Sequence, residues 1–167
     1  MRKYALVALL ALTGTMTLAA CNNGADDTAQ QETQTAQVSK PTDPNDSAAW
    51  GKYLSQVLSQ NMQGMTADRP YPYLVPGGDS DEAKAQRERQ LENVSSIISR
   101  GVTPGNLIAL GGPESSKTAD LTIEALKNSQ PGALKGVIIL FIGDQADQQR
   151  VDEAVKPTGA TLRFVEM

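Results

Sequence analysis

Six consecutive apolar residues, VIILFI at 137–142, are followed by the turn residues Gly143 and Asp144 and then by a helical segment at about 145–155. An uninterrupted apolar run of this length is typical of a parallel strand that is covered on both faces. Two earlier segments repeat the arrangement of a short apolar run, a glycine turn and an amphipathic helix. They are Leu107–Leu110 with Gly111-Gly112 and a helix at about 115–128, and Tyr71–Val75 with Gly77-Gly78 and a helix at about 81–100.

Strands that alternate with helices of this length pair in parallel through right-handed crossovers. A further helix is expected to begin near Ser47, because apolar residues from Trp50 to Leu58 recur at helical spacing. A last strand is expected at 161–165. The sequence therefore predicts a small three-layer α/β domain with three or four mostly parallel strands, preceded by an N-terminal helix. Prolines 70, 72 and 76 would place the segment 71–75 at an edge of the sheet or in a loop.

The first residues have the three parts of an export signal. Arg2 and Lys3 provide positive charge, an apolar run follows at 4–12, and small residues precede the only cysteine of the chain, Cys21. The sequence Leu-Ala-Ala-Cys at 18–21 resembles the lipobox of bacterial lipoproteins. The resemblance implies that residues 1–20 are a signal peptide and that Cys21 carries fatty acyl chains such as palmitate, which anchor the chain to a lipid bilayer.

The residue after the cysteine is Asn22 rather than the aspartate associated with retention at the inner membrane. The resemblance therefore implies a cell-envelope location, at the outer membrane and facing the periplasm. Residues 21–46 are rich in Gln, Thr, Asn and Asp and poor in apolar side chains, which predicts a disordered lipidated tether. Residues 47–167 are then expected to form a single α/β domain.

Composition excludes several kinds of chemistry. The chain has no histidine, and Cys21 would be lipidated, so thiol catalysis, imidazole catalysis and histidine-ligated zinc are not expected. The formal net charge is −4, and removal of the two cations of the signal lowers it to −6. An acidic chain without a basic stripe is not expected to bind nucleic acid. No catalytic residue, metal site or cofactor is predicted. The sequence favours a chain without catalytic activity but does not decide between an enzyme and a non-enzyme.

Parallel strands would bring all the glycine turns to one edge of the sheet, where open α/β sheets bind ligands. Residues 111–118, GGPESSKT, match the phosphate-binding loop pattern except that Ser116 replaces its second glycine. The alternative is a structural turn in which Ser115 caps the next helix and Lys117 is solvated. The residues of this possible ligand edge are Gly111, Gly112, Ser115, Ser116 and Asp144.

Acidic residues would gather at the same edge, where they could bind a hard cation, act as an acid–base pair or simply cap helices. They are Asp79, Asp81, Glu82, Glu114, Asp144 and Asp147. A second candidate surface is the segment RPYPYL at 69–74. Its Arg69, Tyr71 and Tyr73 are of the types that protein interfaces favour, although either tyrosine could instead pack beneath the first helix.

These observations favour a membrane-anchored envelope lipoprotein that acts as a non-enzymatic protein-interaction module. It would be an accessory of an envelope complex or an immunity-type inhibitor, with a protein partner in the envelope. Two alternatives remain. One is a binder of a small anionic or cationic ligand at the glycine-turn edge, and the other is a carboxylate-based hydrolase.

Overall fold

The computed structural model describes residues 39–167, which belong to one structural unit. The expected signal peptide, Cys21 and most of the expected tether lie outside the described residues. In chain order the elements are α1 (Ser47–Gln60), β1 (Tyr71–Leu74), α2 (Asp81–Arg100), β2 (Leu107–Gly111), α3 (Ser115–Leu126), β3 (Ile138–Gly143), α4 (Gln145–Val155), a short 3-10 helix (Lys156–Thr158) and β4 (Thr161–Glu166).

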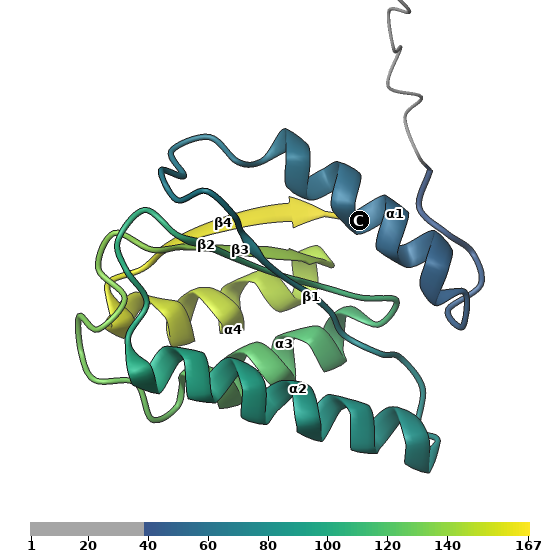
Figure 1. Cartoon of the computed structure of the whole chain (residues 1–167). Helices are drawn as coiled ribbons and strands as arrows, with labels where there is room; N and C mark the ends of the chain where they lie inside the picture. The colour runs from purple at the N-terminus through teal and green to yellow at the C-terminus, as the bar shows by residue number, and fades with distance from the viewer. Residues whose placement is uncertain (1–38) are drawn as a thin grey trace, which may run out of the picture. The chain divides into compact units, whose positions relative to one another are not determined.

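The four strands form one parallel sheet in the order β1-β2-β3-β4, which is also their order in the chain. Successive crossovers of the same hand between neighbouring strands place every connecting helix on the same face of a sheet. Helices α2, α3 and α4 accordingly lie on one side, and α1 lies on the other (Figure 1). The predicted three-layer α/β fold with a parallel sheet is confirmed.

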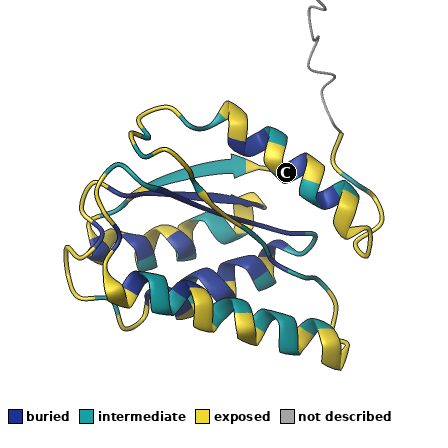
Figure 2. Cartoon of the chain, in the orientation of Figure 1, coloured by how far each residue is buried: buried dark blue, intermediate teal, exposed yellow. Residues whose placement is uncertain are grey.

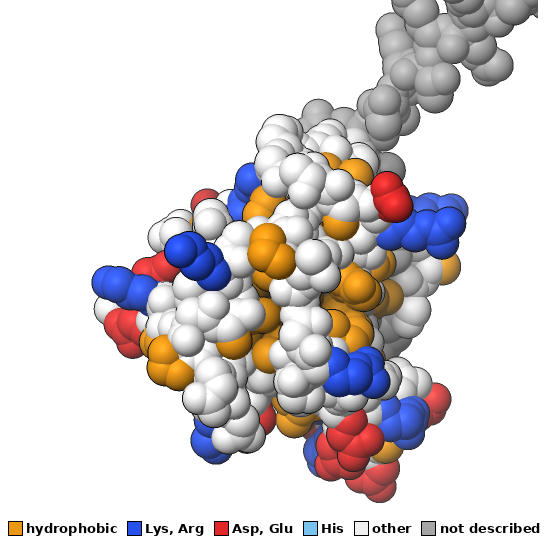
Figure 3. Space-filling view, turned by 60° about the vertical axis from the view of Figure 1, so that its left-hand side comes forward, with side chains coloured by type: hydrophobic (Ala, Val, Ile, Leu, Met, Phe, Trp, Pro, Cys, Tyr) orange, Lys and Arg blue, Asp and Glu red, His pale blue; other side chains and the backbone are white. Residues whose placement is uncertain are grey.

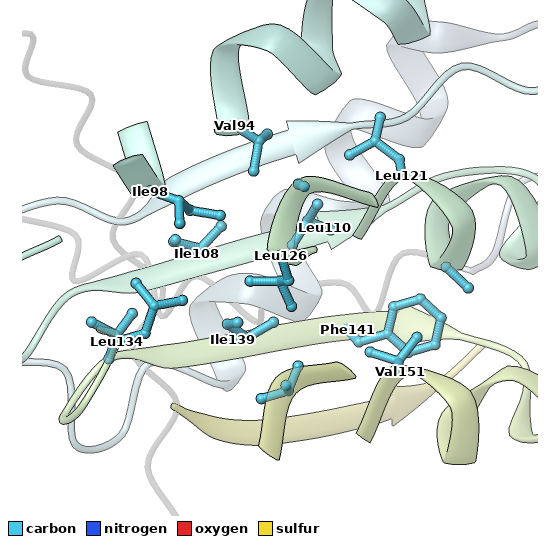
Figure 4. Close-up of a cluster of buried hydrophobic side chains, with 14 of the residues drawn as sticks. Val94, Ile98, Ile108, Leu110, Leu121, Leu126, Leu134, Ile139, Phe141 and Val151 are labelled. Carbon is cyan, nitrogen blue, oxygen red and sulfur yellow. The ribbon is translucent and has the colours of Figure 1, made fainter. Parts of the chain in front are cut away.

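The two inner strands are buried along their whole length, β2 at 107–111 and β3 at 138–143 (Figure 2). Side chains that alternate along them enter two separate apolar clusters, because successive residues of a strand point to opposite faces. Figure 4 shows the cluster on the side of α2–α4, where side chains from these helices, such as Val94, Leu121 and Val151, point toward β2 and β3. Phe141 in this cluster is stacked on Phe164 of β4, with ring centroids 6.1 Å apart.

Helix α1 forms the other apolar cluster with the opposite face of the sheet. Its N-cap is Asp46, whose Oδ1 accepts the N–H of Ala49 at 2.9 Å. Trp50 is 2% exposed, packs edge-on against Tyr53 and donates from Nε1 to the carbonyl of Asp43 at 3.0 Å. The last residues of the expected tether, 43–46, therefore form a turn that is bonded to the first helix.

Strand β1 lies at the edge of the sheet, in agreement with its prolines. Val75 N–H donates to the carbonyl of Gly111 at 2.8 Å, so alternate residues of β1 face β2 and Pro72 faces the free edge. Proline lacks an N–H to donate, and this position requires none. None of the helices within residues 39–167 has the length and apolar character that a membrane span requires.

Candidate functional site

The glycine turns meet at the carboxyl ends of the strands, as the topology predicts. The turn after β1 contacts the turn after β2, and the turn after β2 contacts the turn after β3. In the first contact, a Cβ placed on Gly77 would lie 2.8 Å from the ring of Pro113. In the second, the N–H of Asp144 donates to Ser115 Oγ at 2.7 Å. The structure thus brings together Gly111, Gly112, Ser115 and Asp144.

The glycines at this edge are packed against other parts of the chain. A Cβ on Gly112 would lie 2.1 Å from the carbonyl oxygen of Val75, and one on Gly111 would lie 2.6 Å from a methyl group of Leu54. A Cβ on Gly143 would lie 2.6 Å from Ser115 Oγ. Glycine is needed at these positions because backbone or side chains of the same molecule approach so closely.

Ser115 has a different role from the predicted helix cap. Glu114 is the N-cap of α3 and makes no side-chain cap bond, whereas Ser115 is the first helical residue and only 3% exposed. Besides accepting from Asp144 N–H, its hydroxyl donates to Asp147 Oδ2 at 2.5 Å. The hydroxyl therefore joins the start of α3 to the start of α4. It accepts the N–H of Asp144, the N-cap residue of α4, which in a capping box is bonded by the side chain at position N3 of the same helix.

The side chain of Ser116, in contrast, is exposed, and the neighbouring loop is closed by an ionic cluster. Glu114 Oε1 accepts the backbone N–H of Gly78. Lys117 Nζ lies 2.5 Å from Asp79 Oδ1 and 3.7 Å from Glu114 Oε2, and its side chain is 20% exposed rather than fully solvated. We call Asp79, Glu114 and Lys117 the loop-closing cluster, because their contacts join the turn after β1 to the turn after β2.

Two arginines that were not among the predicted site residues also bond to backbone carbonyls near these turns. Arg87 of α2 donates to the carbonyls of Pro76 and Gly78 at 2.9 and 2.8 Å. Arg150 of α4 bonds to Asp120 at 2.5 Å, to Asp147 at 2.8 Å and to the carbonyl of Ser116 at 3.0 Å. Of these contacts, only the Asp147–Arg150 pair, at helical i,i+3 spacing, could have been found from sequence.

The hydrogen bond and the charge of Lys117 lower the pKa of Asp79, with smaller effects from Lys84 and Arg87. The hydrogen bond to Asp120 raises the pKa of Arg150, and its bond to Asp147 acts in the same direction. Both shifts favour the charged forms, so these groups are held as ion pairs. Within the described residues, no three acidic side chains converge closely enough to hold a metal ion. The predicted acidic residues are distributed among N-cap positions, the first turn of α2 and ion pairs.

A hollow of 610 Å³ lies over α2, α3 and α4, away from the glycines. Four cationic and three acidic side chains line it together with a few apolar ones, so it has no strong preference for one sign of charge. A smaller hollow of 200 Å³ between α1 and the sheet includes Gly111 and is lined mainly by apolar groups. Neither hollow brings Gly112, Ser115 and Asp144 together in one cavity.

The second candidate surface is only partly exposed. Tyr71 is 38% exposed, and Arg69 and Pro72 beside it are also exposed. Tyr73 is half-buried and packs on the cluster beneath α2–α4 rather than under α1, and its burial, followed by the effect of Tyr71, raises its pKa. On the face seen in Figure 3, hydrophobic side chains gather toward the middle and charged side chains toward the rim.

Comparison of the chain with protein-family models, with curated proteins and with solved structures finds no match.

Proposed function

We propose that this chain is a membrane-anchored lipoprotein of the bacterial envelope whose domain binds another protein and catalyses no reaction. The lipobox-like sequence that ends at Cys21 supports the membrane anchor, and the anchor in turn implies the envelope location. The absence of histidine from the sequence limits the catalytic chemistry that the chain could perform.

One observation carries the proposal: the chain's own groups occupy the glycine turns at the edge of the sheet at which α/β proteins bind small ligands, although a hollow of 380 Å³ lies beside Gly77 and Pro113. Gly112 lies against the carbonyl of Val75, Glu114 accepts the N–H of Gly78, and Lys117 pairs with Asp79. A ligand at this edge would have to displace these contacts, whereas a protein partner could bind elsewhere on the surface. The exposed residues Arg69 and Tyr71 offer such a place, because Arg and Tyr are enriched among the interface residues that contribute most of the binding free energy.

An accessory of an envelope complex and an immunity-type inhibitor would both use such a surface. The two differ in partner, the first binding a resident envelope protein and the second an incoming toxin. A neighbouring gene for an exported toxin would favour the inhibitor.

The anchor is tested by labelling cells with an alkyne analogue of palmitate. The unaltered chain is expected to incorporate the label and to sediment with membranes, because the acylated cysteine holds it there. Cys21→Ala should lose the label, whereas the matched variant Asn22→Ala should retain it. Labelling of Cys21→Ala to the level of the unaltered chain would contradict the proposed anchor.

The partner is tested by site-specific photocrosslinking in intact cells. A photoreactive amino acid at Tyr71 is expected to crosslink to one discrete protein, and the same group at Gln149, an exposed position of α4, serves as control. No adduct at Tyr71, or identical adducts at both positions, would contradict binding through this surface. If in addition phosphate or calcium raised the melting temperature and Ser116→Trp abolished that rise, the glycine-turn edge would be a ligand site and the proposal would be wrong.

A further inference from the structure

The two edges of the sheet differ in how their backbone groups are satisfied. In β4, Thr161 N–H donates to the carbonyl of Val137 and Met167 N–H donates to the carbonyl of Gly143. In a parallel ladder, residues at every second position bond to the same neighbour. Residues 161, 163, 165 and 167 therefore face β3, and the backbone groups of Leu162, Phe164 and Glu166 face outward.

No hydrogen bond to these outward groups is present among residues 39–167. The strand has six residues, lacks proline, glycine and lysine, and has only intermediate or high exposure. Arg163 is the only cationic residue of β4. Its guanidinium does not block pairing at the edge, because it donates to the carbonyls of Asn61 and Gln63 beyond the end of α1. An unprotected edge of this length is a template for a further strand.

The opposite edge is protected. Strand β1 has only four residues, and Pro72 removes one of its outward N–H groups. The outward carbonyl of Leu74 accepts a hydrogen bond from Gln90 Nε2 of α2 at 2.5 Å. Short length, proline and a covering side chain are the devices by which sheets block edge pairing. The chain thus blocks one edge and leaves the other available.

We propose that β4 is an interface between two copies of this chain, which pair antiparallel through this strand to form one eight-stranded sheet. The surface is separate from Arg69 and Tyr71, and the inference does not depend on the membrane anchor. Two outward-facing residues must stand opposite each other to exchange a pair of hydrogen bonds. A two-fold axis at Phe164 places Phe164 opposite its symmetry mate and Leu162 opposite Glu166, so all three outward residues of each strand are paired.

Charge disfavours two of the alternative registers. A shift of one position toward the start of β4 would place Arg163 directly opposite Arg163 of the other copy, and a shift of two positions toward its end would do the same for Glu166. Like charges at such positions are destabilising. In the proposed register Arg163 faces Val165 and Glu166 faces Leu162, and the two Phe164 rings extend the stack that begins at Phe141. The strand is therefore complementary to itself.

The test compares two substitutions of Glu166 in the full-length chain, purified in mild detergent. Glu166→Pro removes an outward N–H without touching the bonds between β3 and β4, whereas Glu166→Ala removes only the carboxylate. Sedimentation velocity is expected to show a dimer for the unaltered chain and for Glu166→Ala. The dimer dissociation constant of Glu166→Pro should be at least about tenfold higher, because each dimer loses two hydrogen bonds and gains two ring clashes.

A monomeric unaltered chain at every concentration would overturn the proposal, even if an extended peptide of another protein bound to β4. Equal dissociation constants for Glu166→Pro and Glu166→Ala would also overturn it. The register is checked by oxidising differently tagged chains with Thr161→Cys in one and Met167→Cys in the other, against chains without either substitution. These positions face each other as a non-hydrogen-bonded pair, so a mixed disulfide is expected, whereas two Thr161→Cys chains should not crosslink.

Discussion

Trp50→Ala should remove the main contact by which α1 covers its face of the sheet. Trp50 is 2% exposed, and its ring centroid lies 5.7 Å from that of Tyr53 in an edge-on contact. Truncation of a buried tryptophan costs about 3–5 kcal/mol. The hydrogen bond from Nε1 to Asp43 contributes about 1 kcal/mol of this cost. We therefore expect Trp50→Ala to lower the free energy of unfolding by about 4 kcal/mol, a large part of the roughly 5–15 kcal/mol of a typical domain.

Urea unfolding followed by far-ultraviolet circular dichroism measures this change, since the substitution removes the only tryptophan fluorophore. Trp50→Phe is the matched variant: it retains most of the buried area and the aromatic contact with Tyr53 but loses the Nε1 hydrogen bond. We expect it to cost about 1–2 kcal/mol. A cost below about 1.5 kcal/mol for Trp50→Ala would refute the reasoning that α1 is an integral layer of the core, as would equal costs for the two variants.

Two further predictions concern the edge where the glycine turns meet. Because Lys117 lowers the pKa of Asp79, stability from this pair is present at neutral pH and is lost as pH falls through the lowered pKa. Carboxyl titration by NMR should give Asp79 a midpoint below 3.8, and Lys117→Met should return it toward that value; an unchanged midpoint would contradict the pairing. Ser115→Ala should cost about 1–3 kcal/mol in urea unfolding, because Asp144 N–H loses its acceptor, and exposed Ser116→Ala should cost below about 0.5 kcal/mol. Equal costs for the two serines would exclude the bridging role of Ser115.

The repeated pattern of apolar run, glycine turn and amphipathic helix was sufficient to predict the architecture. The bounds of α2 and α4 agree with those expected, and Gly101 ends α2 with a φ of 91° as a helix stop should. Helix α3, expected to extend to about residue 128, ends at Leu126. These features could be predicted because hydrophobic periodicity and backbone conformation are local properties of a sequence.

Apart from the Asp147–Arg150 pair, the side-chain contacts of the site could not be predicted. Ser115 reads as a helix cap in sequence because serine is favoured there, and nothing local shows that its hydroxyl would bond to Asp144 and Asp147 across two loops. The carbonyl contacts of Arg87 are likewise set by the path of a loop ten residues away. Such contacts depend on how the elements stack in three dimensions, which local patterns do not encode.

The order of the strands has a consequence for the synthesis of the chain. Helix α1 emerges from the ribosome before any strand, yet most of the sheet residues in its cluster lie on β2, β3 and β4, as far as Val165. Its apolar side consequently has no complete partner until most of the chain has been made. The α2–α4 side, in contrast, can be assembled stepwise, since α3 contacts β2 and β3 and α4 contacts β3 and β4, the strands that flank each helix in the chain. Nascent chains that stop before β3 would therefore expose α1 to proteases and chaperones, and its protection would mark the completion of the domain.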